Sequence, residues 1–346
     1  MVPTAKRELV HAQDQWSITQ FCAALTNALA GSGPALGIGN ILSTSVSTDV
    51  ALVVTTSGST GTPKEIHLSA AAVTASAKAA NTFLKADAGN SWSLLLPLTH
   101  IAGINVLVRA LLLKSEVLDF RNNSQYTKAD FTAIVPTQLN RALTADHQLL
   151  KHLQEAKAVL VGGAPLAESD KQRAHANGIN VITTYGMSET SGGCIYNGTP
   201  LDGVAVKIVE NIIYLRGPML AQVPLVDGWL KTTDIGRLEN GKLAVFGRAD
   251  DQIISGGEKI SLSVIEQALS ENFESIFLAF AKPDQEWGER LCIATTLELS
   301  QDTISHFLKN RFGGYATPKE IHKVDEIPLI GIGKPDRAKL IERLAK

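Results

Sequence analysis

The stretch TTSGSTGTPKEI, residues 55–66, begins at the end of the apolar run VALVVTT (50–56) and contains the glycines Gly58 and Gly61. Glycines let backbone N–H groups turn toward an anion without obstruction by side chains. Nearby hydroxyl groups and one lysine add donors and positive charge. We therefore expect a loop that holds a polyphosphate, although a flexible surface loop is the competing interpretation. The pattern is not a Walker A loop, because Pro63 precedes Lys64 and no helix-opening Lys-Ser/Thr pair follows.

Length and composition indicate a globular protein of more than one domain. The chain has 346 residues, with 45% hydrophobic and 19% charged residues, and a single core rarely grows to that length. A net charge of −2 gives no reason to expect a nucleic-acid partner. Three widely spaced cysteines predict neither a disulfide framework nor a zinc site. We see no secretory signal and no apolar run of about 18 residues, so no membrane span, and the cytoplasm is the expected location.

Short apolar runs alternate with helix-like runs between residues 50 and 186. The expected strands are 50–56, 93–98, 131–136, 156–163 and 179–186, and the expected helices include 69–86, with Ser69 as N-cap, and 101–114. This alternation predicts an α/β fold in which a mostly parallel sheet is covered by helices on both faces. Ligand loops of such sheets follow the carboxyl ends of the strands, and Gly162, Gly163 and Gly186 fall at those ends.

The pattern of expected strands and helices changes after about residue 200. Residues 204–217 and 236–248 read as β-hairpins, the second with Asn240-Gly241 as its turn. A polar segment, 249–257, precedes a helix that starts near Ser263. We expect a large N-terminal domain, 1–248, and a small mobile α+β domain, 249–346, with the boundary near Asp250.

Five ordered motifs resemble those of the acyl-adenylate-forming enzymes, a family of acyl- and aryl-CoA ligases, luciferases and adenylation domains. They are TSGSTGTPK (56–64), TTYGMSET (183–190), KTTDIGRL (231–238), GRADDQIISGGEKISLSVIEQAL (247–269) and GIGKPDR (331–337). The resemblance covers the chain from about residue 50 to its end. It implies that a carboxylic acid attacks the α-phosphate of ATP, that diphosphate leaves, and that a thiol such as CoA then displaces AMP.

The resemblance also implies a role for each matching position in nucleotide binding. The phosphate contacts fall on Ser57, Gly58, Ser59, Thr60, Gly61 and Lys64. The adenine and α-phosphate contacts fall on Gly163, Ala164, Tyr185, Gly186 and Ser188, where Ser188 replaces the more usual threonine. Glu189 would ligate Mg²⁺, since a hard cation prefers carboxylate oxygen. Asp234 would accept hydrogen bonds from both ribose hydroxyls, and Arg248 would contact ribose or phosphate.

The C-terminal motifs imply a catalytic lysine on a moving domain. Lys334 would lie between the acid carboxylate and the α-phosphate during adenylation. Asp250 matches the hinge, and Gly256 and Gly257 match the turn beside the thiol channel. A polar interdomain linker would look similar without any rotation, so the hinge rests on the resemblance.

The segment LPLTHIAGINVLVRALL (96–112) contains the residues that indicate which carboxylic acid the protein binds. His100 fits the family's gate position, and Arg109 lies on an apolar helix, which suggests a buried anion partner. That partner is either a structural carboxylate or a second carboxylate on the substrate. The acid-binding set is then His100, Arg109, Gly162 and Gly186, with His100 and Arg248 assisting Lys334 in catalysis.

This segment resembles the o-succinylbenzoate–CoA ligases of menaquinone biosynthesis, whose substrate is a dicarboxylic aromatic acid. The phosphate loop begins near residue 57, roughly a hundred residues earlier than in most of the family, as in some short ligases of that pathway. The shortened chain is expected to expose apolar surface that a homodimer would cover. Two alternatives stay open: a ligase for another aryl or short acid, acting on CoA or a carrier protein, and a non-catalytic nucleotide-binding homologue.

Overall fold

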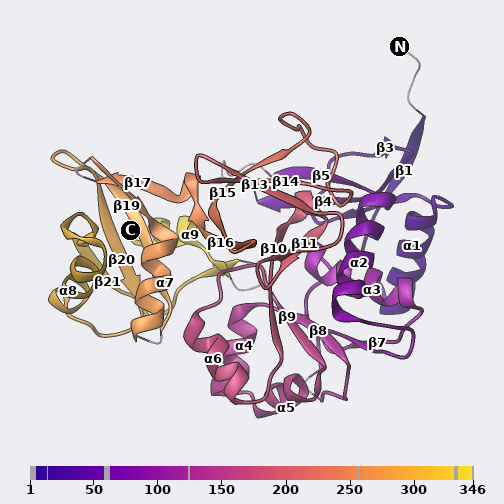
Figure 1. The fold of residues 1–346 in the computed structure, drawn as a ribbon, viewed down its shortest axis with the longest axis horizontal. Coiled ribbons are helices and arrows are strands. Elements are labelled where there is room, and N and C mark those ends of the chain that lie inside the picture. Colours follow the sequence, from indigo (N-terminus) through magenta and orange to yellow (C-terminus); the bar gives the residue numbers. More distant parts are fainter. Residues whose placement is uncertain are drawn as a thin grey trace.

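The computed structural model describes residues 5–13, 15–57, 63–123, 125–255, 257–273, 275–330 and 334–344. The predicted phosphate-loop residues Gly58, Ser59, Thr60 and Gly61, and the predicted channel residue Gly256, lie outside these ranges. The described residues form a mixed α/β fold, as the sequence predicted (Figure 1).

A five-stranded sheet forms from the first part of the chain, in the order β3-β1-β2-β4-β5. Its strands are β1 (Lys6–His11), β2 (Ala35–Ile38), β3 (Ser45–Ser47), β4 (Val50–Ser57) and β5 (Pro63–Ser69). The neighbours β1, β2 and β4 run parallel, and helix α1 (Ile18–Ala30) makes the crossover from β1 to β2. Strand β4 confirms the strand predicted before the phosphate loop.

A seven-stranded sheet has the order β12-β11-β10-β9-β8-β6-β7. Its strands are β6 (Trp92–Leu94), β7 (Val117–Asp119), β8 (Phe131–Ile134), β9 (Ala158–Val161), β10 (Val181–Met187), β11 (Gly192–Tyr196) and β12 (Thr199–Pro200). The five strands from β10 to β7 are parallel, which confirms the predicted parallel arrangement. Strand β6 begins one residue before the predicted 93–98 and ends at Leu94, three residues before Pro97.

Helices cover both faces of the seven-stranded sheet. Helix α2 (Ala70–Leu84) begins at the predicted N-cap, where the Ser69 side chain accepts a hydrogen bond from the Ala72 N–H. Helix α3 (Ile101–Leu113) packs with α1 and α2 in the core that joins the two sheets. Helices α4 (Pro136–Thr144), α5 (His147–Glu155) and α6 (Glu168–Ala176) cover the opposite face.

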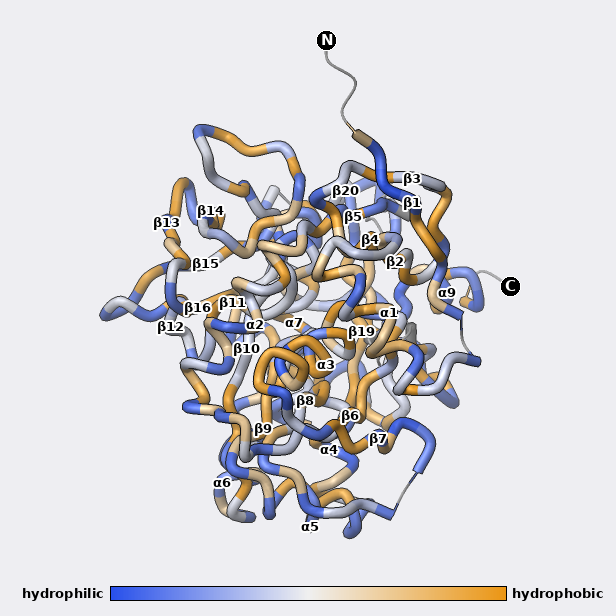
Figure 2. The backbone as a smooth tube through the Cα atoms, turned by 90° about the vertical axis from the view of Figure 1, so that its right-hand side faces the viewer, coloured by the Kyte–Doolittle hydropathy of each residue, from blue (hydrophilic) through white to orange (hydrophobic). Residues whose placement is uncertain are grey.

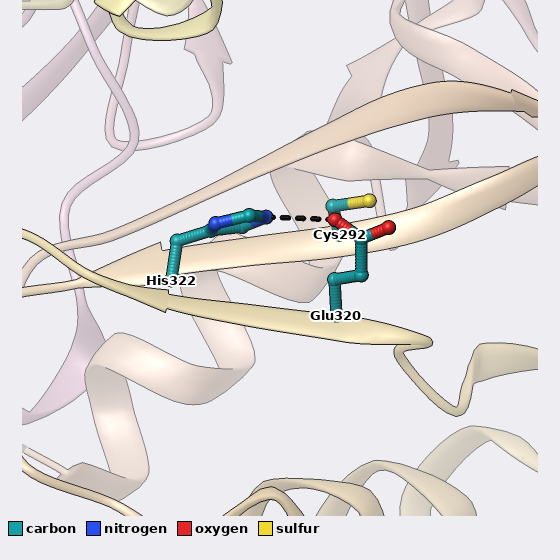
Figure 3. A group of neighbouring side chains, drawn as sticks. All are labelled: Cys292, Glu320 and His322. Carbon is teal, nitrogen blue, oxygen red and sulfur yellow. Dashed lines mark hydrogen bonds and ion pairs between the residues drawn. The ribbon is translucent and has the colours of Figure 1, made fainter. Parts of the chain in front are cut away.

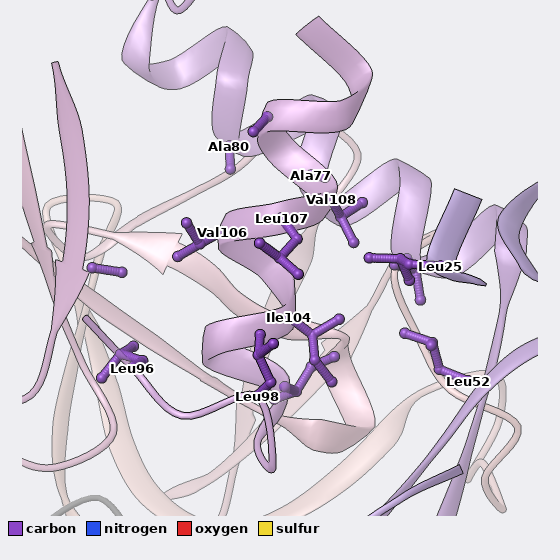
Figure 4. Close-up of a cluster of buried hydrophobic side chains, with 14 of the residues drawn as sticks. Leu25, Leu52, Ala77, Ala80, Leu96, Leu98, Ile104, Val106, Leu107 and Val108 are labelled. Atoms are coloured by element: carbon purple, nitrogen blue, oxygen red, sulfur yellow. The ribbon is translucent and has the colours of Figure 1, made fainter. Parts of the chain in front are cut away.

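Helix α3 is apolar around its circumference because it is enclosed by other elements. Ile104, Val106, Leu107 and Val108 are fully buried, and together they point to several sides of the helix (Figure 4). Figure 2 shows the same helix as a hydrophobic segment. None of the helices in the described ranges is long and apolar enough to cross a membrane.

A four-stranded antiparallel sheet, β13-β14-β15-β16, follows. It consists of two hairpins, β13 (Ala205–Val209) with β14 (Ile212–Arg216), and β15 (Leu230–Glu239) with β16 (Lys242–Arg248). Asn240 and Gly241 have φ angles of 51° and 77°, which fit a type I′ turn. Both predicted hairpins are therefore confirmed.

The last part of the chain forms a smaller α+β unit (Figure 1). Its elements are β17 (Gln252–Ser255), β18 (Glu258–Ser261), α7 (Leu262–Phe273), β19 (Phe277–Asp284), β20 (Gly288–Thr295), α8 (Gln301–Phe312), β21 (Glu320–Lys323), β22 (Leu329–Ile330), β23 (Lys334–Pro335) and α9 (Arg337–Leu344). Its two hydrophobic clusters contain residues from 253 onward only, whereas the other clusters end at residue 243.

Candidate active site

The turn after β9 brings the backbone close to β10. The Gly162 N–H bonds to the Ile134 carbonyl over 3.2 Å, and a Cβ at Gly162 would lie only 2.1 Å from Thr184 Oγ1. Gly163 has a φ of +84°, which favours glycine, and Ala164 is exposed. The predicted strand-end turn therefore exists, with glycines at positions that restrict side chains.

Gly186 lies near the carboxyl end of β10, where the predicted strand 179–186 placed it. Antiparallel pairing with β11 extends β10 to Met187, and Gly186 pairs with Gly193. A Cβ at Gly186 would lie 2.1 Å from the Gly192 carbonyl oxygen. This close approach leaves no room for a side chain on that side of the strand.

Glu189 and Ser188 lie in a short 3₁₀ turn, η1 (Ser188–Thr190), directly after β10. Thr190 holds the turn, since its Oγ1 accepts a hydrogen bond from the Met187 N–H over 2.9 Å and donates to the Gly192 carbonyl over 2.7 Å. The Glu189 carbonyl accepts a bond from the Ala221 N–H over 2.8 Å. The backbone is thus anchored while the Glu189 side chain is half-buried, and its oxygens are of the type that Mg²⁺ prefers.

Tyr185 and Asp234 form one hydrogen-bonded pair. Tyr185 Oη donates to Asp234 Oδ2 over 2.6 Å, and the Asp234 N–H donates to Thr232 Oγ1 over 3.0 Å. Thr232 in turn donates to the Ile213 carbonyl. Burial, with the Asp234 charge as a second cause, raises the pKa of Tyr185 far above its ordinary value, so the phenol stays a donor. The motifs predicted both residues but not their bond.

Thr232 is a supporting residue that the sequence reading missed. Its hydroxyl accepts a hydrogen bond from the backbone N–H two residues later, as in the turns that serine and threonine commonly form. The T-x-D spacing was therefore a usable signal.

Arg248 lies beside Asp234 but bonds elsewhere in this structure. The two residues are paired across β15 and β16. The guanidinium donates to both carboxylate oxygens of Asp250, over 2.7 and 2.6 Å. For Arg248 to contact a ribose or phosphate, its ion pair with Asp250 would have to open, or the guanidinium would have to donate to Asp250 and the nucleotide at once. Gly257, in the turn after β17, has a φ of +84° and open space where a Cβ would stand.

His100 and Arg109 do not converge on one point. His100 is half-buried at the start of α3, where its carbonyl accepts the Ile104 N–H. Arg109 lies nine residues on, which is roughly 13 Å along the helix axis and on the opposite side of the helix. His100 and Arg109, two of the four predicted acid-binding residues, therefore lie toward opposite ends of α3.

Arg109 is enclosed and has an aromatic environment. Its side chain is 4% exposed, Nη2 donates to Tyr196 Oη over 3.1 Å, and the guanidinium lies 5.3 Å from the Trp92 ring centre. Nε has no hydrogen-bond partner among the described residues. No carboxylate within the described ranges is paired with Arg109, so the structural-carboxylate alternative finds no support here.

Tyr196 connects Arg109 with the glycine-lined strand ends. A Cβ at Gly193 would lie 3.2 Å from Tyr196 Cε1 and 3.3 Å from Thr184 Cβ, and Thr184 borders Gly162. Neither Tyr196 nor Trp92 was predicted as a site residue, because a buried aromatic residue carries no distinguishing signal in a sequence.

Lys64 and Lys334 are the two lysines that were predicted as site residues. Lys64 is exposed and pairs with Thr56 across the β4–β5 hairpin, next to the phosphate-loop residues. Lys334 is described by its backbone, which pairs with Ile330 between β23 and β22.

A second group of potential metal ligands lies in the C-terminal unit. Cys292, Glu320 and His322 are neighbours on β20 and β21 (Figure 3). Glu320 is already bonded to Lys282, to Arg290 over 2.8 Å and to His322 over 3.0 Å. Two cations neutralise this carboxylate, so the cluster is an ion-pair network and does not resemble the Glu189 site.

The fold and these strand-end residues define a class of protein. The AMP-binding enzyme family matches residues 8–216, and the C-terminal domain of AMP-binding enzymes matches residues 275–334. The chain therefore belongs to the AMP-binding enzymes, and the predicted family is confirmed.

The similarity can be stated for individual members of this family. The probable 2-succinylbenzoate–CoA ligase of Mycobacterium tuberculosis is 37% identical over 93% of this chain and 94% of its own length. A structure of E. coli MenE with bound OSB-AMS superposes with a TM-score of 0.76 at 25% identity, covering 96% of this chain and 81% of that chain. The Bacillus subtilis o-succinylbenzoate coenzyme A synthetase, in complex with ATP and magnesium ion, shares the fold at 21% identity, with a TM-score of 0.74 and coverage of 92% and 82%.

Proposed function

We propose that this chain is an AMP-forming acid–CoA ligase that converts o-succinylbenzoate, ATP and CoA to o-succinylbenzoyl-CoA, AMP and diphosphate. The observation that carries the proposal is the 37% identity to a probable 2-succinylbenzoate–CoA ligase over nearly the whole of both chains. Strand-end glycines and the Tyr185–Asp234 pair support a nucleotide site of the same kind.

In the first step, an oxygen of the acid carboxylate bonds to the α-phosphorus of ATP and the bond to diphosphate breaks. Two anions must approach each other, so positive charge and strict positioning are needed. Lys334 neutralises both anions in this proposal, assisted by Arg248 and His100. The phosphate loop with Lys64 holds the β- and γ-phosphates, and Asp234 accepts hydrogen bonds from the ribose hydroxyls.

Glu189 fits a magnesium ligand, because η1 fixes its backbone and leaves its carboxylate half-buried beside the end of β10. When bound there, Mg²⁺ would supply charge neutralisation at the phosphates. The second step is attack of the CoA thiol sulfur on the acyl carbon, with AMP as the leaving group. For that step we propose that the unit 249–346 rotates about Asp250 and presents Gly256 and Gly257 to the thiol arm.

The aromatic acid places its second carboxylate toward Arg109 in this proposal. A buried guanidinium without a carboxylate partner is costly unless an anion or aromatic faces compensate it, and here Tyr196 and Trp92 supply only part of that compensation. A ligase for a monocarboxylic acid has no evident use for such a residue at this place.

Acid-dependent release of diphosphate tests the proposal. Purified protein with ATP and Mg²⁺ is given o-succinylbenzoate, benzoate, 2-acetylbenzoate, a short fatty acid or a long fatty acid. We expect the fastest release with o-succinylbenzoate and CoA-dependent formation of its thioester. Preference for another acid favours the alternative ligase, and no release with any acid favours a non-catalytic nucleotide-binding protein.

A further inference from the structure

Arg337 joins four segments of the C-terminal unit through one guanidinium. Nε donates to the Ala279 carbonyl over 2.7 Å, Nη2 donates to Glu266 Oε1 over 2.8 Å, and Nη1 donates to Asp251 Oδ1. These partners belong to β19, to α7 and to η2 (Ala249–Asp251). All three guanidinium nitrogens therefore donate hydrogen bonds, an arrangement that the single ammonium group of a lysine cannot reproduce.

The carboxylates are themselves anchored to the backbone. Glu266 Oε1 also accepts the Ala279 N–H over 2.8 Å, and Asp251 Oδ2 accepts the Ser263 N–H over 3.0 Å. The Glu266 and Asp251 side chains are only 18% and 13% exposed. Bonds between such shielded groups are screened less than surface ion pairs, so the network resists displacement.

Arg337 is also the first residue of α9, three positions after Lys334. The strand that carries Lys334 is otherwise held by a two-residue pairing with β22 and by the bond from the Asp336 N–H to the Pro328 carbonyl over 2.7 Å. Leu340, which is 1% exposed, seats the following turn of α9 against Leu278 and Phe280. The guanidinium thus connects the lysine segment directly to Asp251, the residue after the proposed hinge.

We propose that Arg337 is a positioning residue that fixes the Lys334 segment relative to the hinge turn, so that domain rotation delivers the lysine to one place. This inference rests on the proposed function for the role of Lys334. Asp251, Glu266 and Arg337 all follow the hinge, so the network persists through the rotation. Its loss loosens Lys334 and leaves intact the opposite face that serves the thioester step.

The test compares the two half-reactions in full-length variants. In Arg337→Lys we expect adenylate formation to fall roughly 10- to 100-fold, the range that a displacement of about 1 Å produces. Thioester formation from supplied acyl-adenylate should stay within about twofold of the unmodified protein. The double variant Arg337→Met with Glu266→Gln removes the guanidinium together with the Glu266 charge and leaves Asp251 with its bond from the Ser263 N–H. It should give the same split if the lysine variant folds poorly.

Arg343→Met is the matched control, because Arg343 lies on the same helix and makes one exposed ion pair, with Glu326 over 3.0 Å. It should leave both half-reactions unchanged. Hydrogen exchange at the amides of Lys334 and Asp336 supplies a readout that needs no substrate. Exchange there should be faster in the Arg337 variants than in the control.

An unchanged ratio of the two half-reactions, or unchanged exchange at these two amides, would overturn the inference. The half-reactions are measured with whichever acid the unmodified protein uses. Rejection of o-succinylbenzoate by the unmodified protein would therefore count against the proposed function and not against the role of Arg337.

Discussion

The phenol of Tyr185 donates a 2.6 Å hydrogen bond to the carboxylate of Asp234 and thereby joins β10 to β15. One strand belongs to the parallel sheet and the other to the antiparallel sheet. A carboxylate held from one side keeps its remaining oxygen at a defined position. In the proposed ligase that position faces the ribose of ATP.

Tyr185→Phe removes this hydrogen bond and keeps the aromatic ring. A hydrogen bond to a charged group contributes about 1.5–3 kcal/mol, of which nucleotide binding senses a part. We expect the KM for ATP to rise several-fold while the KM for the acid changes little. Tyr214→Phe is the control, because that ring lies on β14 and has a cation–π contact with Lys207. Equal changes in the two KM values would contradict the role of the pair.

Lys334→Ala should affect the two half-reactions very differently. We expect diphosphate release with acid and ATP to be abolished, because no other group replaces the lysine charge between the two anions. Thioester formation from supplied acyl-adenylate should be largely preserved. Lys339→Ala, on the exposed face of α9, serves as the control. Similar losses in both steps would remove Lys334 from its assigned role.

Arg109→Met tests the acid pocket with a side chain of similar length. We expect the KM for the dicarboxylic aromatic acid to rise much more than the KM for ATP, since the second carboxylate loses its cation. Benzoate, which has a single carboxylate, should be affected less. Equal effects on acid and ATP would indicate that the Tyr196 and Trp92 contacts of Arg109 are purely structural.

Gly186→Ala places a methyl group 2.1 Å from the Gly192 carbonyl oxygen. The strands β10 and β11 would have to separate, and overpacking of this kind costs about 1–3 kcal/mol. We expect a lower urea midpoint and lower activity. Gly314→Ala is the control, since nothing lies within 4 Å of its Cβ position. An unchanged midpoint for Gly186→Ala would show that the strands accommodate the methyl group.

His152 makes the stability of the fold depend on pH. It is 2% exposed, its Nε2 lies 2.9 Å from Ser93 Oγ, and Tyr126 stacks on its ring. Burial lowers the pKa of His152 below its ordinary value of about 6.5, so the unfolded chain binds the proton more readily. The contribution to stability is therefore complete above about pH 6.5 and is lost as the pH falls below that value.

Urea unfolding of the unmodified protein and of His152→Gln between pH 7.5 and 5 measures this effect. We expect the free energy of unfolding to fall more steeply in the unmodified protein, by at most about 1.4 kcal/mol per pH unit for one proton. Parallel pH profiles for the two proteins would show that His152 does not contribute.

Local elements were predictable from the sequence because they depend on neighbouring residues. The run before Ser57, the cap at Ser69 and the Asn240-Gly241 turn each act over a few positions, and each was found as predicted. The predicted strand 179–186 ends one residue before β10 does, because antiparallel pairing with β11 extends β10 to Met187 and that partner is not visible in the local pattern.

The sequence by itself determined the order of strands and helices, through short-range hydrophobic periodicity, and it determined the family, through motifs that are contiguous in the chain. Only the tertiary structure decided which of these residues meet. Tyr185 and Asp234 are 49 positions apart, Asp251 and Arg337 are 86 apart, and Arg109 and Tyr196 are 87 apart. Contacts over such separations depend on how sheets and helices pack, which no local pattern encodes.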